Sequence, residues 1–288
     1  MIGLVHLVWA PLGPQPLREF LRSYHAHPAG AEHELIVVLN GVRRGESPGD
    51  SSRGSALRAA LLAELDDTEH RLVELERPVL DLPAYGLAAR RVEHERLCFL
   101  NSYGTILVDG WLAGLARALE DPGVGIAGAT GSWESQAEWI RGRPLYWPYQ
   151  LALLRRARRD YPRFPNPHLR TTAFLLERPL LLEMDLERAA DKRATYLLES
   201  GPRSITRQVL ERDLRPVVVG RDGCVYDVED WARSGTYRAG GQANLIVADN
   251  RTGDWERASP RLRRRLSRDA WGPPTQRPTA ALWKNRSP

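Results

Sequence analysis

The sequence predicts an α/β protein built around a central, mostly parallel sheet. Apolar runs of strand length alternate along the chain with segments whose apolar residues recur at helical spacing. This alternation is typical of crossover units, in which a helix returns the chain to the next parallel strand. The 288 residues are 42% hydrophobic and 27% charged, a globular composition that excludes a wholly disordered chain.

The first half of the chain shows the alternation most clearly. The run 2–9 is continuously apolar, as expected of a strand buried on both faces, and Asn40-Gly41 gives a turn signal after the second run. Residues 43–53 are polar and rich in Gly and Ser, which predicts a loop. The expected strands are 2–9, 34–39, 71–75, 97–100 and 124–127, and the expected helices are 17–24, 56–65, 82–92 and 111–119.

The second half is more irregular. Residues 144–167 are rich in Pro, Arg and aromatic side chains, with a short basic helix expected at 151–158. Further strands are expected at 171–176, 196–198 and 215–219, and helices at 179–184 and 202–212. The chain therefore predicts one α/β body with an irregular C-terminal extension.

Ligands of open parallel sheets bind outside the carboxyl ends of the strands. Candidate binding residues are therefore those that follow the predicted strands. They are Trp9, Ala10, Pro11, Asn40, Asp81, Asn101, Ser102, Tyr103 and residues 128–132.

At these strand ends the sequence resembles GT-A-fold glycosyltransferases, in the style of family 2. Residues 98–103 followed by Gly110-Trp111-Leu112 are similar to the strand, acidic motif and helix of those enzymes. Residues 124–131 and 171–175 resemble two later strands, and Leu198-Glu199-Ser200-Gly201 stands where the family carries its catalytic carboxylate. The resemblance implies a Rossmann-like α/β/α sandwich with a mostly parallel mixed sheet over about residues 2–220.

The resemblance also implies an organisation and an activity. Residues 1–245 would form one domain, with a nucleotide-sugar-binding half at 1–115 and an acceptor half at 116–245, followed by a partly helical tail at 246–288. The activity would be hexosyl or deoxyhexosyl transfer from a nucleoside diphosphate donor to a hydroxyl of a glycan, a lipid-linked molecule or another acceptor. Such enzymes serve bacterial polysaccharide biosynthesis.

The chain departs from the family at its acidic motif. Asn101-Ser102-Tyr103 replaces the usual Asp-x-Asp, whose carboxylates hold a divalent ion beside the diphosphate. Mg²⁺ or Mn²⁺ is therefore expected to be weakly bound or not required. Arginines can neutralise a leaving phosphate instead, and the candidates are Arg90, Arg170, Arg203 and Arg207. The alternative is that Asn101 and Tyr103 merely end a strand in an inactive fold.

Glu199 is the candidate catalytic base. A single carboxylate suffices for an inverting transfer, because it takes the proton of the acceptor hydroxyl and the nucleotide leaves already ionised. Ser200 and Pro202 suggest a helix start directly after it. The alternative interpretation is a glutamate that only favours the positive end of that helix.

The other candidates divide between the two substrates. Trp9, Ala10, Pro11, Asn40 and Asp81 are expected at the nucleotide, with Tyr85 packing on it at i+4 from Asp81. Thr130, Gly131, Trp133, Glu134, Arg170 and Arg203 are expected at the sugar or acceptor. Trp9 as a core residue, Asp81 as a helix cap and residues 130–134 as a self-packed lid are the alternatives. His6 and His168 are expected to have no special role.

The charge pattern indicates further partners. Lys192 and Lys284 are the only lysines, so arginine supplies nearly all of the net charge of +5. A GC-rich bacterial genome is the simpler explanation of this bias, and the functional alternative is recognition of a phosphorylated substrate or an anionic surface by arginine. The arginine clusters at 155–159 and 261–265 indicate solvated helix faces or contact with a membrane surface that bears a lipid-linked acceptor. Nucleic acid is disfavoured, because no helix-turn-helix or zinc-finger spacing occurs.

Two further interpretations concern the tail and the chain as a whole. The polar segments 240–244 and 249–252 form either a loop that folds back over the site or an ordinary surface segment. Two cysteines exclude a disulfide scaffold, and the apolar runs are too short to span a bilayer, which predicts a cytoplasmic protein, or one at the inner face of the membrane. The rival function is a non-catalytic basic module that binds a glycan, a membrane surface or nucleic acid.

Overall fold

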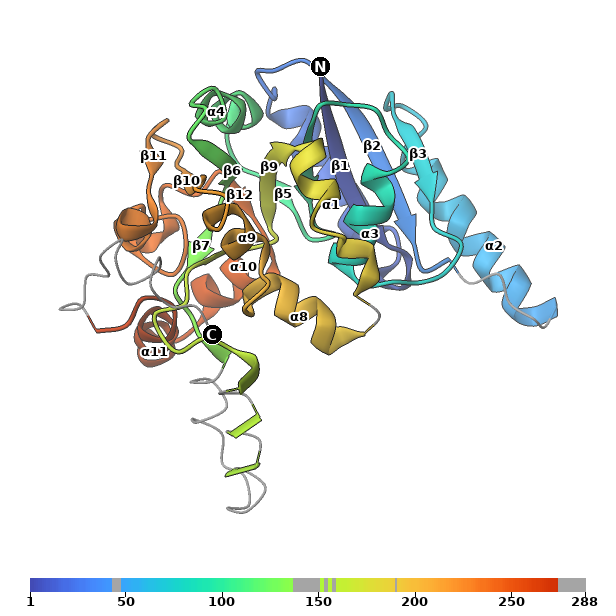
Figure 1. Cartoon of the computed structure of the whole chain (residues 1–288). Helices are drawn as coiled ribbons and strands as arrows, with labels where there is room; N and C mark the ends of the chain where they lie inside the picture. The colour runs from blue at the N-terminus through green and yellow to red at the C-terminus, as the bar shows by residue number, and fades with distance from the viewer. Residues whose placement is uncertain (43–47, 137–150, 153–154, 157–158, 190, 274–288) are drawn as a thin grey trace.

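A mixed sheet of eight strands forms the centre of the computed structural model, which describes residues 1–42, 48–136, 151–152, 155–156, 159–189 and 191–273 (Figure 1). Its strands are β1 (Ile2–Trp9), β2 (His33–Asn40), β3 (Arg71–Glu74), β4 (Arg96–Leu100), β6 (Val124–Gly128), β9 (Ala173–Glu177), β10 (Arg215–Val219) and β11 (Val225–Tyr226). Their order is β11-β10-β6-β9-β4-β1-β2-β3. Strand β9 runs antiparallel to β4 and β6, β11 runs antiparallel to β10, and the other pairs are parallel.

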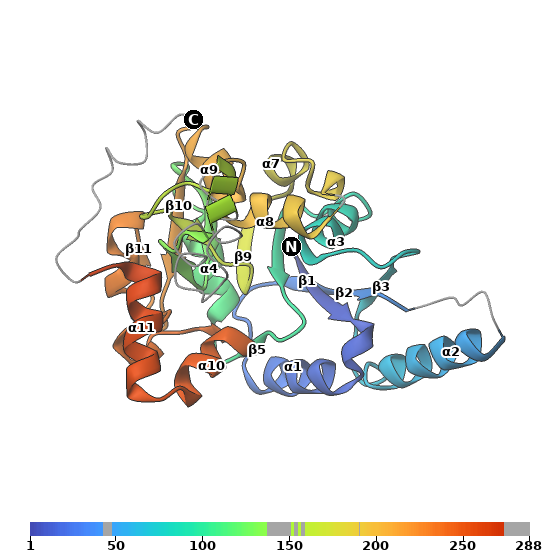
Figure 2. The ribbon, with the colours of Figure 1, turned by 90° about the horizontal axis from the view of Figure 1, so that it is seen from below.

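Helices cover both faces of this sheet. Helices α1 (Gln15–Ala26), α2 (Pro48–Ala63) and α4 (Trp111–Ala118) contribute to one core, and α3 (Asp81–Ala89), α7 (Arg178–Leu182) and α9 (Ile205–Leu210) contribute to the other. Figure 2 shows α1 and α2 on one side of the sheet and α3, α7 and α9 on the opposite side. The predicted α/β/α sandwich with a mostly parallel mixed sheet is therefore confirmed.

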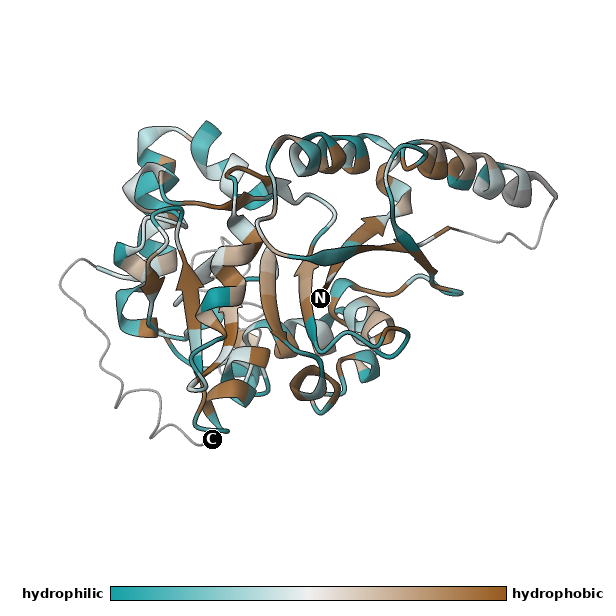
Figure 3. Cartoon of the chain, turned by 90° about the horizontal axis from the view of Figure 1, so that it is seen from above, coloured by the Kyte–Doolittle hydropathy of each residue, from teal (hydrophilic) through white to brown (hydrophobic). Residues whose placement is uncertain are grey.

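Strand β1 shows why the sheet is buried on both faces. Successive side chains of a strand point to opposite sides, so Leu4 and Val8 enter one core while Val5 and Leu7 enter the other. A continuous apolar run is the sequence pattern that this double burial requires. The sheet strands are accordingly the most hydrophobic part of the chain in Figure 3.

The C-terminal segment returns to the body of the protein. Strand β12 (Val247–Ala248) pairs with β5 (Thr105–Ile106), and helices α10 (Asn250–Arg257) and α11 (Pro260–Trp271) follow. The main-chain N–H of Trp133 donates to the carbonyl of Ala270 over 3.0 Å. Trp133 lies between β7 (Gly131–Ser132) and β8 (His168–Leu169), which pair with each other. The end of α11 thus packs directly on the second half of the fold.

Several expected elements are different in the structure. Residues 196–198 belong to α8 (Lys192–Ser200) and not to a strand, because Asp191 caps this helix by accepting from the N–H of Ala194. Ser204, and not Ser200, caps the next helix, which is α9. Helix α2 begins at Pro48, inside the predicted loop 43–53. Much of the predicted basic helix at 151–158 lies outside the described residues.

The remaining elements are short 3₁₀ turns. They are η1 (Ala10–Leu12), η2 (Leu186–Arg188), η3 (Val228–Arg233) and η4 (Gly240–Gln242). In the part of the chain that the structure describes, no helix combines the length and apolar character needed to cross a bilayer.

Candidate active site

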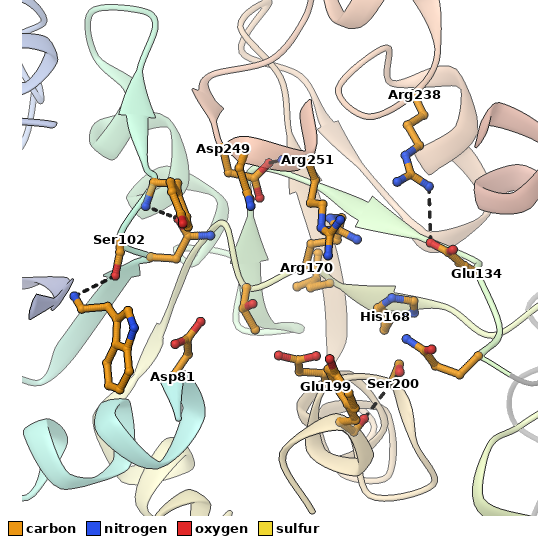
Figure 4. Close-up of a pocket in the computed structure, with 18 of the residues that line it drawn as sticks. Asp81, Ser102, Glu134, His168, Arg170, Glu199, Ser200, Arg238, Asp249 and Arg251 are labelled. Carbon is orange, nitrogen blue, oxygen red and sulfur yellow. Dashed lines mark hydrogen bonds and ion pairs between the residues drawn. The ribbon is translucent and has the colours of Figure 1, made fainter. Parts of the chain in front are cut away.

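A cavity of about 550 Å³ opens at the edge of the sheet where β1 and β4 end and β9 begins. One wall comes from the ends of β1 and β4 and the start of α3. The opposite wall comes from β8, α8 and the start of α10. Segments far apart in the sequence therefore meet around one space, and Figure 4 shows the side chains that surround it.

The wall formed by β1 and β4 is held by local hydrogen bonds. The main-chain N–H of Trp9 donates to Oγ of Ser102 over 3.0 Å, which ties the two strand ends together. Oδ1 of Asn101 accepts from the N–H of Tyr103 over 3.0 Å. Leu12 and Tyr103 remain exposed at the mouth of the cavity. Residues 101–103 thus line the cavity.

Asp81 enters the cavity from the first residue of α3. The N-cap of this helix is Leu80, so Asp81 is not the cap. Burial raises the pKa of its carboxyl above the ordinary value. Asn40 holds the preceding loop, since its side-chain amide donates to the carbonyl of Val79 and accepts from the N–H of the same residue. Asn40 is itself fully buried and supports the loop that leads to Asp81.

Glu199 faces the same cavity from the last turn of α8. Burial, followed by the negative charge of Asp81, raises the pKa of its carboxyl to about 7. The positive charges of Arg170, Arg251 and Lys192 act in the opposite direction. In Figure 4, Asp81 and Glu199 extend into the cavity from α3 and α8, and Arg170 and Arg251 lie above Glu199. A carboxyl with such a pKa can exchange protons near neutral pH.

Two arginines stack on one tyrosine ring in the opposite wall. Cζ of Arg170 lies 4.4 Å from the ring centroid of Tyr237, and Cζ of Arg238 lies 4.8 Å from it. Nε of Arg170 and Nε of Arg238 are buried and have no hydrogen-bond partner in the described part of the chain. Oε2 of Glu134 lies 3.6 Å from Nη1 of Arg238. Guanidinium groups fixed in this way are well suited to bind an anion.

Helix α11 supports this stack. Nε1 of Trp271 donates to the carbonyl of Tyr237 over 2.8 Å, and Oγ of Ser267 donates to the carbonyl of Arg238 over 2.7 Å. Both bonds end on the main-chain carbonyls of the residues that form the stack, Tyr237 and Arg238. Helix α11 therefore fixes the backbone that carries Tyr237 and the cavity-lining Arg238.

Arg251 is positioned by the start of α10. The side chain of Asp249 accepts from the N–H groups of Arg251 and Thr252, and the side chain of Thr252 accepts in return from the N–H of Asp249, which forms a capping box. The hydroxyl of Thr172 donates to Oδ2 of Asp249 over 2.7 Å. The segment 249–251 is thereby held against the residues that precede β9.

His168 also lines the cavity. It is buried, and its Nδ1 donates to the carbonyl of Asn166 over 2.9 Å. Burial lowers the pKa of the imidazole to about 4, so the ring is neutral at physiological pH. A neutral imidazole, held by this hydrogen bond, thus lines the cavity.

Several residues that the sequence assigned to the nucleotide lie elsewhere. Tyr85 is fully buried and packs on Phe99 and Phe174, with ring centroids 4.7 and 5.9 Å away, so it cannot pack on a nucleotide. Arg90 is paired with Asp185 and Glu187 and is not among the residues that line the cavity. Of the three residues after β1, Trp9 lines the cavity, whereas Ala10 is fully buried and Pro11 is exposed outside it.

The predicted acceptor residues are corrected in the same way. Nε1 of Trp133 donates to the carbonyl of Val228, and its ring packs edge-on against Trp271, so the indole belongs to the core. A Cβ on Gly131 would lie 2.5 Å from the ring of Trp231, which shows how closely these residues pack. Thr130 is fully buried. Arg203 is exposed outside the cavity, whereas Glu134 and Arg170 line it.

Sequence reasoning missed Tyr196, Ser200 and Arg238 as lining residues, whereas segment 249–251 lines the cavity as one of the two alternatives for the tail proposed. The Asp249-x-x-Thr252 spacing is a helix-start signal and was open to detection. The pairing of β12 with β5 and the stacking of Arg238 on Tyr237 leave no local pattern in the sequence. These residues could not have been placed without the fold.

The donor set does not fit a hard divalent cation. In the described ranges, no three His, Cys, Asp or Glu side chains gather in a metal-binding arrangement. Oδ1 of Asn101 already accepts from Tyr103, and both carboxylate oxygens of Asp249 accept hydrogen bonds. Mg²⁺ and Mn²⁺ favour carboxylate oxygens that are available for coordination. No step of the chemistry below is therefore derived through a metal.

Comparison with known proteins gives similarities of fold. No protein-family model matches the chain, and no curated protein sequence matches it. The mannosyltransferase PcManGT from Pyrobaculum calidifontis, solved with GDP-Man and Mn²⁺, is 15% identical with a TM-score of 0.42, over 81% of this chain and 61% of that chain. The galactosyltransferase LgtC, solved with donor and acceptor sugar analogues, is 11% identical with a TM-score of 0.40, over 72% of this chain and 70% of that chain.

A synthase is similar to the chain to a comparable degree. The 4-diphosphocytidyl-2C-methyl-D-erythritol synthase from Anaerococcus prevotii DSM 20548 is 10% identical with a TM-score of 0.43, over 76% of this chain and 88% of that chain. A mannosyltransferase and a galactosyltransferase are thus among the solved structures to which the chain is similar. The chain spans about three fifths of the length of PcManGT. Function has to be argued from the site.

Proposed function

We propose that the protein transfers a hexosyl or deoxyhexosyl group from a nucleoside diphosphate donor to an acceptor hydroxyl. The observation that carries the proposal is the placement of Glu199, a half-buried glutamate whose pKa desolvation raises to about 7, in a cavity that also contains Arg170 and Arg251. One group can accept a proton near neutral pH, and the others can stabilise the charge of a leaving phosphate. Both requirements of glycosyl transfer are met in one space.

The proposed reaction is a direct displacement with inversion. The acceptor oxygen attacks the anomeric carbon and gives its proton to the carboxylate of Glu199. The bond between that carbon and the phosphate oxygen breaks, and the electron pair leaves with the nucleoside diphosphate. Arg170 and Arg251 bind the diphosphate, and the segment of Trp9, Ser102 and Asp81 binds the nucleoside. This assignment follows from the order of the walls around the cavity.

The acceptor is a glycan or a lipid-linked molecule in this proposal, as in polysaccharide synthesis. A lipid-linked acceptor requires work at the cytoplasmic face of a membrane, where anionic headgroups attract arginine-rich helices. Helix α11 carries exposed Arg261, Arg264 and Arg265. In the other arginine cluster, residues 155–159, Arg158 lies outside the described residues.

Release of nucleotide from a panel of nucleotide sugars tests the proposal. Wild-type protein is expected to release nucleoside diphosphate from at least one donor. Glu199→Gln is expected to lower turnover at least ~100-fold and to leave donor affinity nearly unchanged, because the amide cannot accept the proton. Glu211→Gln, at an exposed glutamate beyond α9, is the matched control.

The outcome of this assay also separates the rival function. A basic binding module would bind nucleotide, glycan or membrane without releasing nucleotide from any donor. Unchanged turnover in Glu199→Gln would remove Glu199 from the mechanism.

A further inference from the structure

Three exposed apolar side chains line the cavity, although most of the other lining residues are polar. Among the described residues, Leu12, Tyr103 and Tyr196 are large hydrophobic side chains that are exposed, at 36%, 41% and 36%, and all three line this cavity. They come from η1, the end of β4 and helix α8, so no single amphipathic element explains them. Exposed apolar side chains that border a polar cleft indicate a ligand with both kinds of surface.

Tyr196 stands one helical turn before Glu199. Residues three apart on a helix lie on the same face, with Cβ atoms about 5–6 Å apart. Both side chains line the cavity, Glu199 within it and Tyr196 at its exposed mouth. A molecule bound against the ring of Tyr196 is therefore next to the proposed base.

The ring of Tyr196 is held in place on one side. Nζ of Lys192, one turn earlier on α8, lies 5.5 Å from the ring centroid. This contact restricts the orientation of an otherwise exposed side chain. Holding the ring lowers the entropy that is lost when a ligand binds to it.

The chemistry of the rim fits a sugar ring better than an acyl chain. One face of a pyranose consists of C–H groups, which pack on the negative face of an aromatic ring, while its hydroxyls remain directed toward polar partners. An acyl chain would gain nothing from Glu199, Ser200 and His168, which lie directly inside the mouth. The neutral imidazole of His168 is suited to bind a hydroxyl.

We propose that Tyr196 is a stacking platform for a carbohydrate acceptor, which it holds so that a hydroxyl reaches Glu199. The inference rests on the proposed function and deepens it, because it assigns the acceptor to the class of sugars. Tyr196 is a binding residue and takes no part in proton transfer.

Two variants of Tyr196 test the proposal. With a donor found by the nucleotide-release panel, methyl glycosides serve as acceptor probes and long-chain alcohols as the apolar comparison. Tyr196→Ala is expected to raise the acceptor KM for methyl glycosides about threefold to tenfold, with kcat, donor KM and donor hydrolysis without acceptor within about twofold. Tyr196→Phe keeps the ring and is expected to restore the wild-type KM.

Val225→Ala is the matched control, since Val225 is an exposed hydrophobic residue of the edge strand β11, outside the cavity lining. An unchanged KM for methyl glycosides in Tyr196→Ala would overturn the proposal. A loss seen only with the long-chain alcohols would overturn it as well and would assign the rim to an apolar chain.

A binding experiment keeps the two proposals distinguishable. Saturation-transfer NMR with methyl glycosides needs no turnover, and its signal is expected to weaken in Tyr196→Ala and to persist in Tyr196→Phe. If no donor releases nucleotide, the proposed function fails while this contrast still decides the role of Tyr196. Equal signals in all three proteins contradict a sugar platform.

Discussion

The guanidinium of Arg170 lies over the ring of Tyr237, with 4.4 Å between Cζ and the ring centroid. The same ring carries Arg238 at 4.8 Å. Two positive groups are thus held beside one aromatic ring, which is nearly fully buried and cannot turn aside. The position of the proposed phosphate-binding arginine is therefore set by a neighbour that does not itself line the cavity.

Tyr237→Leu is expected to weaken the binding of nucleoside diphosphates about tenfold, because Arg170 loses its support. Tyr237→Phe is expected to stay within about twofold of wild type, since the hydroxyl of Tyr237 has no hydrogen-bond partner among the described residues. Calorimetry with uridine, guanosine and thymidine diphosphate measures both. Equal affinities for the Leu and Phe variants, at similar melting temperatures, would show that the stack does not position Arg170.

The raised pKa of Glu199 predicts a pH profile. A base works in its deprotonated form, and the pKa of Glu199 is about 7, so kcat/KM is expected to rise with pH through about 7. Asp81→Asn removes a negative charge that raises this pKa, and the midpoint is expected to move to lower pH. A midpoint that stays in place in Asp81→Asn would contradict the coupling between the two carboxyls.

The donor set around the cavity predicts that turnover survives metal removal. Rates are expected to change less than about twofold after treatment with EDTA, whereas Arg251→Ala is expected to raise donor KM at least about tenfold, because a charge-assisted contact to phosphate is lost. Arg257→Ala, on the same helix and paired with Asp254, is the matched control. A strict requirement for Mg²⁺ or Mn²⁺ would defeat the assignment of the diphosphate to arginines.

The capping box of α10 links stability to donor binding. Asp249→Ala is expected to lower the free energy of unfolding by about 0.5–2 kcal/mol, since two N–H groups lose their acceptor. It is also expected to raise donor KM, because Arg251 is no longer fixed. Ser259→Ala removes the N-cap of α11 at the end of that helix away from Ser267 and Trp271, and it serves as the control for a loss of helix capping. Urea denaturation measures the free energy of unfolding, and initial rates measure the donor KM. If Asp249→Ala and Ser259→Ala had the same donor KM, Asp249 would have no role in positioning Arg251.

The strands of the sheet could be predicted from the sequence, because a strand that is buried on both faces is a continuous run of apolar residues. The run 215–219 coincides with β10, and the runs around residues 36 and 98 fall within β2 and β4. The segment 196–198 was predicted wrongly as a strand. Three residues are too few to distinguish the helical period of 3.6 residues from the strand period of 2. The residue that caps the helix is Asp191, which lies before the segment.

The candidate site was predictable only where strand ends define it. Trp9, Asp81 and residues 101–103 follow strands or begin a helix after one, and they line the cavity together with Glu199, which the resemblance supplied. Tyr85 and Trp133 were assigned to substrates because aromatic residues occur near ligands. Their rings instead belong to the core, because they pack against residues that are distant in sequence. Arg238 and Arg251 depend on such contacts too.

The cavity joins the two ends of the folded chain, since Trp9 lines it from β1 and Arg251 lines it from α10. A ribosome delivers these residues in order, so the first strands can pair while the opposite wall has not yet been synthesised. Any nascent chain that stops before Tyr237 carries Arg170 without the ring that holds it. The proposed anion-binding site can therefore form only after Tyr237 has been synthesised, which is later than every strand of the eight-stranded sheet.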